Sequence, residues 1–403
     1  MTDPMTRFPH HQNPDQLVVT RDDKVVRTLP CQRIEIPGRD RFESHHIGAD
    51  VGETSDGMLY AMISGVFVTS ADRGVTWQDA PVSDTPTGTF GSLLVLRNDT
   101  LIIVAGGGEQ SFTFHRSSDR GATWNKISTL ECDPFDLNYP DNNPIELDDG
   151  SLLMPAIFHF NEPTKDLPQP SSRYGIDAQY MIRSVDGGRT WQNLPDAQFF
   201  KTAHESHFQL VGISKDTTYP GPGGSFPGCY ETHLLQLPDG RVLAALRYSG
   251  YPQPWHDAYA KRWGAADEAD AHGRVFRHIM LGTSPDRGST WQDLRPVADE
   301  TGHTVLLHGE CTGELVRLPD GRIVLIHQRR YPRGWSQHVA HVSADEGHTW
   351  SRDVYMVMAG FGYSGSTVLD DGTIITVNGQ AFMDERDRKM APFNAQVIRW
   401  RVD

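Results

Sequence analysis

The chain has 403 residues, an apolar content of 37% and a formal net charge of −15. This acidic balance argues against a nucleic-acid or anionic-membrane partner on bulk electrostatics. The four cysteines are scattered without a C-x-x-C pair, so the sequence indicates neither a zinc site nor a disulfide framework, and nothing in it calls for a metal or organic cofactor.

The N-terminal stretch 1–17 is polar, contains three prolines and lacks an apolar run. Neither a signal peptide nor a membrane-spanning helix is therefore expected. On this ground the sequence predicts a cytoplasmic protein, or a secreted one if an export signal was removed.

An eight-residue frame, Ser-x-Asp-x-Gly-x-Thr-Trp, recurs along the chain. Its five copies, here called Asp frames, are Ser70–Trp77, Ser117–Trp124, Ser184–Trp191, Ser284–Trp291 and Ser343–Trp350. Asp followed two residues later by Gly is typical of a turn, because Gly tolerates positive φ and the carboxylate accepts bonds from nearby backbone N–H groups. The Trp then returns into a sheet, where its apolar face can be buried. Each copy is predicted to be a turn that pins one strand to the next.

A second repeated element consists of two apolar runs on either side of an Asp-Gly-type turn, which is a strong hairpin signal. The six predicted hairpins are Glu53–Met62, Leu93–Ala105, Ile145–Ala156, Leu234–Arg247, Leu315–Gln328 and Ser366–Asn378. Two turns per repeat give about four strands per repeat, and four-stranded units repeated around an axis make a β-propeller. The sequence therefore predicts an all-β chain, with a single six-bladed propeller domain over 1–403 and four-stranded antiparallel blades.

The sixth hairpin has no Asp frame after it, and we expect both chain ends to close its blade and so protect the edge strands. Ala395–Val402 should supply one strand, and Gln16–Arg21 or Lys24–Leu29 its partner. Insertions are expected at about 160–175, 212–228 and 251–273, with a short helix over Asp257–Ala271. Long loops inside a compact domain are often functional, although a solvated surface insertion is the alternative.

The hairpins also serve to locate the residues expected at the rim of the propeller channel. Counting back eight residues from each hairpin Asp gives Gly48, Gly91, Asp141, Glu231, Thr312 and Tyr363. Counting forward eight gives Arg247 in the fourth blade and Gln328 in the fifth. A structural ring is more often small or apolar, so Asp141, Glu231, Arg247 and Tyr363 are functional candidates; the alternative is a structural polar ring.

Taken together, these features resemble the Asp-box sialidases, the BNR-repeat group. The segment from Glu231 to Arg247 resembles a sialidase segment in which a Glu precedes a hairpin and an Arg follows it. The run Gly362-Tyr363-Ser364-Gly365-Ser366 resembles the segment that carries the sialidase nucleophile. The resemblance implies an exo-acting glycoside hydrolase that cleaves a terminal acidic sugar similar to sialic acid.

The family pattern also implies roles for individual residues. A Tyr attacks the anomeric carbon, which makes sialidases an exception to the two-carboxylate pattern of glycosidases, and a Glu acts as its base. Tyr363 and Glu231 match these roles. The family clamps the substrate carboxylate with three Arg, because a guanidinium pairs with it bidentately. Arg247 matches one of them, Arg330 and Arg333 are candidates for a second, with Arg333 preferred, and Tyr248 and His233 complete the candidate substrate-binding set.

Two family features have no match in this chain. The rim position of the first blade holds His45-His46-Ile47-Gly48 in place of an Arg, and Ala61–Gly65 has no carboxylate where the general acid is expected. His46 is a candidate cation or acid–base group, and its alternative is a hydrogen-bonded rim residue. The carboxylates available as general acid are Asp50, Asp136 and Asp141, of which the count places only Asp141 at the rim.

Three functions stay open at this point. The first is the sialidase-type hydrolase described above. The second is a propeller glycosidase or polysaccharide lyase that acts on a uronic-acid or neutral sugar and uses His46 with Tyr363 or Tyr139. The third is a non-catalytic glycan-binding propeller. All three predict a carbohydrate as the partner.

Overall fold

The structure is a computed structural model of the 403-residue chain. It describes residues 9–36, 49–63, 66–80, 86, 91–106, 111–131, 136–140, 143–159, 177–194, 228–250, 276–306, 310–329, 336–360, 362–378, 381–384, 389–392 and 395–403. No helix among them is long and apolar enough to cross a membrane. The chain divides into two compact units: residues 1–107, 113–129 and 314–403 form the first, and residues 108–112 and 130–313 form the second.

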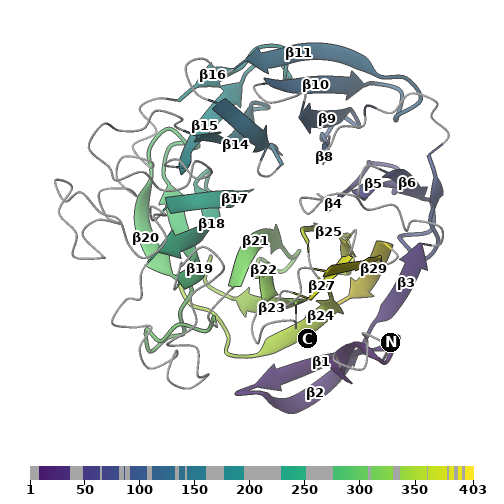
Figure 1. Cartoon of the computed structure of the whole chain (residues 1–403), viewed down its shortest axis with the longest axis vertical. Coiled ribbons are helices and arrows are strands. Elements are labelled where there is room, and N and C mark those ends of the chain that lie inside the picture. The colour runs from purple at the N-terminus through teal and green to yellow at the C-terminus, as the bar shows by residue number, and fades with distance from the viewer. Residues whose placement is uncertain are drawn as a thin grey trace. The chain divides into compact units, whose positions relative to one another are not determined.

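The described strands form six blades, and the chain has the six-bladed β-propeller fold that the repeats predicted (Figure 1). Blades 1 to 3 are β4 (Ala49–Glu53), β5 (Leu59–Ile63), β6 (Val66–Ser70) and β7 (Gln78–Asp79); β8 (Gly91–Val95), β9 (Leu101–Gly106), β10 (Ser111–Ser117) and β11 (Asn125–Glu131); and β12 (Asp136–Pro140), β13 (Ile145–Glu146), β14 (Leu152–His159), β15 (Asp177–Ser184) and β16 (Gln192–Asn193).

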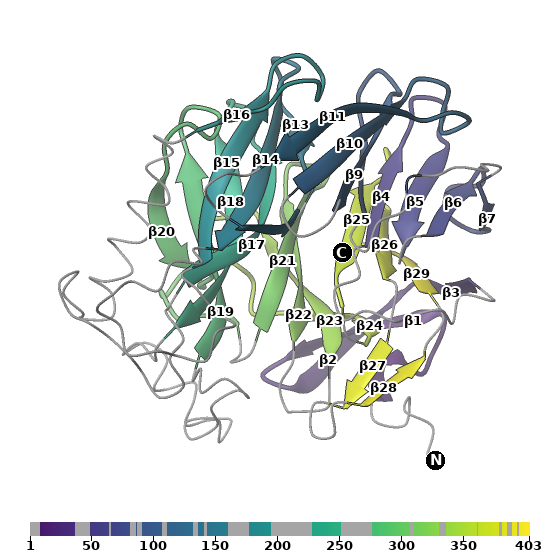
Figure 2. The ribbon, with the colours of Figure 1, turned by 45° about the horizontal axis from the view of Figure 1, so that its top comes forward.

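The remaining blades follow the same antiparallel order. Blades 4 to 6 are β17 (Gly228–Gln236), β18 (Val242–Gly250), β19 (Phe276–Ser284) and β20 (Gln292–Pro296); β21 (Glu310–Arg317), β22 (Ile323–Arg329), β23 (Gln337–Ser343) and β24 (Val354–Ala359); and β25 (Ser364–Val368), β26 (Ile374–Asn378), β29 (Ala395–Trp400) and β3 (Gln32–Ile36). Outside the blades lie the 3-10 helix η2 (Pro9–His11) and a separate hairpin of β27 (Ala381–Asp384) and β28 (Lys389–Pro392) (Figure 2).

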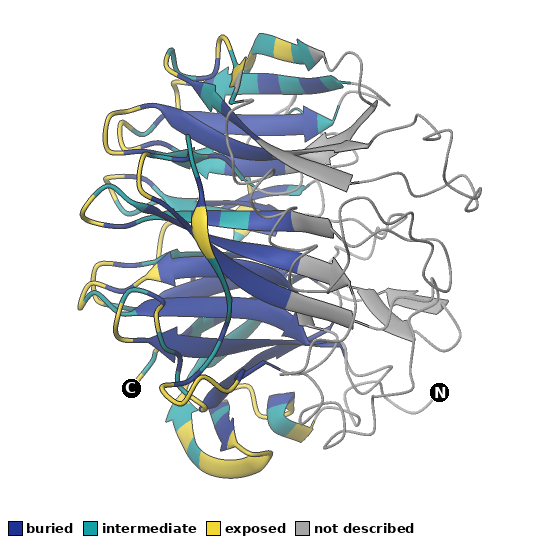
Figure 3. Ribbon diagram, turned by 90° about the vertical axis from the view of Figure 1, so that its left-hand side faces the viewer, coloured by how far each residue is buried: buried dark blue, intermediate teal, exposed yellow. Residues whose placement is uncertain are grey.

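All six predicted hairpins are confirmed. Their turns share one bond, from the backbone N–H at the tip to a carbonyl three residues earlier, as from Gly57 to Thr54 at 2.8 Å and from Gly372 to Leu369 at 2.9 Å. Glycine is suited to this position because its φ of 83° at Gly57 lies in the left-handed region. Figure 3 shows the result: the strand interiors are buried and the turns are exposed.

Blade 6 is closed by both chain ends, as predicted, but the predicted N-terminal partner was wrong. β29 pairs with β3, from Ala395 opposite Ile36 to Arg399 opposite Gln32. The segments Gln16–Arg21 and Lys24–Leu29 instead form β1 (Gln16–Arg21) and β2 (Lys24–Pro30), a hairpin that pairs with β24 and extends blade 5 (Figure 1).

The difference follows from where the apolar side chains are buried. Leu17 and Val19 of β1 pack fully buried in the core of blade 5, with Val324 and Ile326. Ile36 of β3 packs with residues of blades 6 and 1. Since burial of apolar area sets strand register, each N-terminal strand adds to the sheet whose core accepts its side chains.

The Asp frames are the self-bonded turns that the sequence predicted. In the copy of blade 4, Ser284 Oγ donates to Asp286 Oδ1 at 3.0 Å and accepts from Gly288 N at 2.7 Å. Asp286 in turn accepts from the backbone and hydroxyl of Thr290 at 2.6 and 2.7 Å. Bonds of the same kind lower the pKa of Asp119 to about 2, with the Thr123 hydroxyl as the largest contribution.

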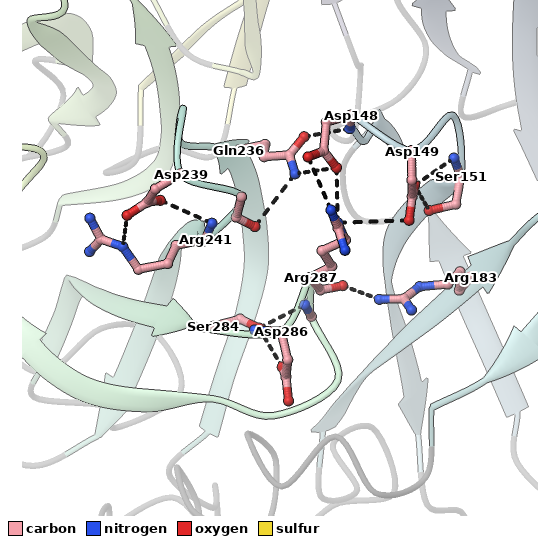
Figure 4. Close-up of polar contacts among 12 residues, drawn as sticks. Asp148, Asp149, Ser151, Arg183, Gln236, Asp239, Arg241, Ser284, Asp286 and Arg287 are labelled. Carbon is pink, nitrogen blue, oxygen red and sulfur yellow. Dashed lines mark hydrogen bonds and ion pairs between the residues drawn. The ribbon is translucent and has the colours of Figure 1, made fainter.

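Three Asp frames also connect neighbouring blades. Their fourth residue is an Arg whose side chain pairs with the hairpin turn of the preceding blade: Arg73 with Asp370 at 2.7 Å, Arg120 with Asp56, and Arg287 with Asp148 at 2.9 Å. Figure 4 shows the last of these, with Arg287 lying between Asp148 and Asp149. Exposed ion pairs of this kind contribute little to stability, so we expect the packing of the frame's Gly against the preceding blade to matter more.

Gly288→Ala tests that packing. An added Cβ would lie 2.5 Å from Leu153 Cδ2 in the core of blade 3, at a φ of +90°, whereas at Gly150, with a φ of +80°, it would meet nothing within 4 Å. Both variants carry backbone strain, but only Gly288→Ala overpacks the core, so we expect it to lower the free energy of unfolding by about 1–3 kcal/mol more than Gly150→Ala. Urea denaturation of the two variants measures the difference, and equal losses would contradict the packing argument.

Candidate functional site

Two candidates from the sequence, Glu231 and Arg247, form an ion pair in the second unit. Arg247 Nη1 donates to Glu231 Oε1, and both residues are buried, with 6% and 4% of their surface exposed. The β17–β18 hairpin produces this pairing, because it sets Tyr230, the residue before Glu231, opposite Arg247. The carboxylate and the guanidinium compensate each other's charge away from water, and a buried pair broken on one side leaves a costly unpaired charge.

The backbone at Glu231 is unusual. Its φ is 50°, in the left-handed region that residues other than Gly seldom adopt. The register of β17 against β18 shifts between Tyr230 and His233, so Glu231 lies in a β-bulge. Strained backbone and bulges are frequent next to active sites, where they redirect a side chain. Thr312, at the equivalent position of blade 5, has a φ of 55°, so two blades share this backbone conformation.

His233 follows the bulge on the same strand. Burial lowers the pKa of its imidazole to about 4, so the ring is neutral at neutral pH. Tyr248 belongs to β18, where its backbone lies opposite Cys229 and His278. Its role in substrate binding stays a prediction, as does that of His233.

Tyr363, the predicted nucleophile, lies in the first unit, directly before β25. It is half-buried, and its backbone carbonyl accepts a hydrogen bond from Asn378 Nδ2 at 2.8 Å. The preceding Gly362 has a φ of 117°, which only glycine adopts without strain. The chain therefore enters β25 through a bend, with Tyr363 at its end.

Polar residues of blade 5 accompany Tyr363 in the first unit. Gln328 and Arg329 end β22, and opposite them His338 and Gln337 begin β23. All four are buried, Arg329 to 5% exposure, and His338 Nε2 lies 2.9 Å from Asn378 Nδ2. Arg329 directly precedes Arg330, one of the two Arg candidates from the sequence, and it is a buried cation at the end of β22.

Glu314 on β21 was missed by the sequence reasoning. Its carboxyl group accepts hydrogen bonds from the backbone N–H and, at 2.9 Å, the hydroxyl of Ser366 on β25. Burial raises the pKa of Glu314 to about 8, and the charge of Asp50 adds to the shift. At neutral pH this carboxyl group is mostly protonated, which is the state that a general acid needs.

Asp50, one of the carboxylates considered for the acid role, lies on β4 and is buried. Its Oδ2 accepts from the backbone N–H of Leu93 on β8 at 2.9 Å. β4 approaches β25 so closely that a Cβ on Gly365 would lie 2.2 Å from the carbonyl oxygen of Ala49. The sequence did contain a signal for Glu314 and Asp50, because both stand six residues before the Asp of a hairpin turn. The rim residues had been located by counting back eight residues from that Asp.

Several predicted residues lie outside the described part of the chain. They are His46, Asp141, Arg330 and Arg333, together with the predicted helix Asp257–Ala271 and most of the three insertions. Asp136 and Tyr139 belong to β12, whose backbone alone is described. The roles given to all of these residues stay predictions.

No protein-family model matches the chain. In sequence it is similar to a xyloglucanase from a Paenibacillus species, with 26% identity over 246 residues, which is 57% of this chain and 23% of that protein. The chain thus spans about a quarter of the length of this relative.

Solved structures that are named as glycoside-cleaving enzymes share the fold. The Penicillium chrysogenum α-L-arabinanase complexed with arabinobiose has a TM-score of 0.56 at 14% identity, covering 96% of this chain and 99% of its own. The GH93 α-L-arabinofuranosidase of Fusarium graminearum with arabinobiose has a TM-score of 0.57 at 15% identity, covering 91% and 97%. The Hadza microbial sialidase Hz136 has a TM-score of 0.54 at 15% identity, covering 93% and 71%. At these identities the similarity shows the fold, and it confirms the sialidase-like propeller that the sequence predicted.

Glu314→Gln should change how stability depends on pH. The folded pKa, about 8, lies above the ordinary value of 4.5, so the folded protein retains a proton that the unfolded chain releases. The stability that this proton provides is full below pH 4.5 and is lost as the pH rises through 8. Between pH 5 and 8 we expect the free energy of unfolding of the wild type to fall relative to that of Glu314→Gln, by an amount on the order of a few kcal/mol.

Urea denaturation of both proteins across this range measures the difference. Glu35→Gln, at an exposed position on β3, is the control for removing one carboxyl group that is not buried, and its profile is the baseline for that of Glu314→Gln. A difference between wild type and Glu314→Gln that is constant over the range would contradict the raised pKa.

Proposed function

We propose that the chain is a glycoside hydrolase. The buried Glu231–Arg247 pair on a left-handed bulge carries this proposal, because it prepares a carboxylate and its orienting cation inside the fold. The fold is shared with an arabinanase, an arabinofuranosidase and a sialidase, and a xyloglucanase resembles part of the sequence. Fold alone does not determine function, so the proposal rests on the residues in this fold.

The first candidate activity is that of an exo-sialidase. In the family pattern a Tyr hydroxyl oxygen forms a bond to the anomeric carbon, a Glu takes the phenolic proton, and the bond to the leaving oxygen breaks as that oxygen receives a proton from an acid. Tyr363 and Glu231 match these two roles in the sequence. Water then cleaves the tyrosyl–sugar bond and restores Tyr363. The match of Tyr363, Glu231 and Arg247 to the family pattern favours this candidate, with Arg247 pairing with the substrate carboxylate.

The second candidate is a glycosidase that acts on a neutral sugar chain. The relative in sequence is named a xyloglucanase, and two of the structural neighbours are named for arabinose-containing substrates. The ion pair also favours it, since Glu231 already compensates the charge of Arg247 and a neutral sugar needs no further cation. A substrate carboxylate would have to compete with Glu231 for the same guanidinium.

A panel of substrates tests the class and separates the candidates. Aryl α-sialoside, aryl α-L-arabinofuranoside, arabinan and xyloglucan should include at least one that the protein hydrolyses, and failure on every glycan assayed, including uronic-acid glycans, would contradict the proposal. On the substrate that is cleaved, we expect Tyr363→Phe to lower kcat by at least about 100-fold if Tyr363 is the nucleophile. Tyr355→Phe, which removes the hydroxyl bonded to Asp403 at 2.6 Å in blade 5, should keep wild-type kcat.

Arg247→Lys tests which kind of sugar is bound. Lysine keeps a positive charge beside Glu231 but cannot form the two parallel bonds of a guanidinium. For an acidic sugar we expect KM to rise by about tenfold or more, while for a neutral sugar KM should stay within about threefold of the wild-type value. Steady-state kinetics on a sialoside and on a neutral glycoside measure KM for the wild type and for Arg247→Lys and so distinguish the two kinds of sugar.

A further inference from the structure

Tyr363 is not held by a regular strand. The β25–β26 ladder ends at the pair Ser364–Asn378, and Tyr363 lies one residue beyond it. On its other side the chain bends through Gly362 and Gly360, with φ values of 117° and 122°. The position of the tyrosine therefore depends on contacts other than the ladder.

Asn378 makes one of these contacts. Its Nδ2 donates to the carbonyl oxygen of Tyr363 at 2.8 Å, so the side chain of the last ladder residue continues the pairing by one step. The orientation of the amide is fixed, because only the nitrogen can donate to a carbonyl oxygen. Asn378 is fully buried, and water cannot easily replace the bond.

The same amide nitrogen reaches a second blade. His338 Nε2 on β23 lies 2.9 Å from Asn378 Nδ2. Since Nδ2 is a donor, Nε2 accepts, and the proton of a neutral imidazole then lies on Nδ1. His338 is also fully buried, and β23 is paired on both sides, with β22 and β24. A side chain in the middle of blade 5 thus holds the amide that holds Tyr363.

We propose that Asn378 and His338 are positioning residues that fix the backbone of Tyr363 and so aim its phenol at the sugar. This inference rests on the proposed role of Tyr363 as nucleophile. Both residues act through the Tyr363 carbonyl, and the geometry assigns them no contact with substrate. A displacement of about 1 Å in a reacting group can cost about 100-fold in rate, which is the scale of effect expected when the amide is lost.

The test combines a spectroscopic readout with kinetics. The protein is labelled with 3-fluorotyrosine, and the ¹⁹F resonance of Tyr363 is assigned from its disappearance in Tyr363→Phe. In Asn378→Leu, which removes the donor at similar volume, we expect the Tyr363 resonance to shift or broaden and the Tyr355 resonance to stay. On the substrate that the protein cleaves, kcat should fall about 100-fold with KM within about threefold of wild type.

Thr376→Val is the matched control. Thr376 is also fully buried on β26, and its hydroxyl also contacts two partners, Ser366 Oγ and Trp400 Nε1, each at 3.0 Å. Its loss should leave the Tyr363 resonance in place even where it lowers stability. His338→Gln, whose amide oxygen can accept from Asn378, should retain the wild-type resonance, whereas His338→Leu should shift it.

The outcomes distinguish this inference from the function on which it rests. An unmoved Tyr363 resonance in Asn378→Leu, in a folded protein, overturns the positioning role. A moved resonance together with a loss of kcat supports it. A moved resonance with wild-type activity in Tyr363→Phe supports the contact of Asn378 with Tyr363 and overturns the proposed nucleophile.

Discussion

In five of the blades the first strand pairs on one side only within its sheet, and the free edge of that strand explains two of the buried carboxyl groups described above. β4, β8, β17, β21 and β25 each stand at an end of their sheet. The N–H groups on their other edge need acceptors, since an unsatisfied buried N–H is costly. In the first unit these acceptors are side chains of the neighbouring blade: Asp50 accepts from Leu93, and Glu314 accepts from Ser366. At these two edges the buried carboxyl groups have a structural role before any substrate is considered.

The burial that lets a carboxyl group satisfy a strand edge also changes the pKa of that carboxyl group. Glu314 is buried to satisfy an edge, and the same burial raises its pKa to about 8. In the second unit, Glu231 is buried as well, but an Arg lies against it and compensates its charge. Desolvation and a neighbouring opposite charge are the two main ways in which a protein sets the charge of a carboxyl group. Each unit therefore contains a carboxyl group whose environment differs from that of a solvated side chain.

The repeats made the fold predictable, while the residues around Tyr363 were only partly so. Asp-Gly turns and Asp frames act locally, so their spacing revealed the hairpins and the number of blades. The predicted N-terminal partner of β29 was wrong because more than one N-terminal segment has a suitable apolar pattern. Only the cores that receive Leu17 of β1 and Ile36 of β3 distinguish these segments. Glu314 was missed because a single offset was counted. His338 and Asn378 could not be found at all, since nothing in sequence spacing indicates that an amide of one blade meets an imidazole of the next.

The way Tyr363 is held explains how a propeller can fix the backbone of a residue that lies on a bend. Glycines such as Gly362 give the chain freedom to leave the ladder, which by itself would leave the tyrosine loosely placed. Asn378 opposes that freedom with one bond to the backbone, and His338 opposes rotation of the amide with a second. Both bonds are buried, so water cannot easily reach these groups and replace a hydrogen bond that is lost. Both restraints therefore act on the main chain at Tyr363 through the carbonyl of that residue.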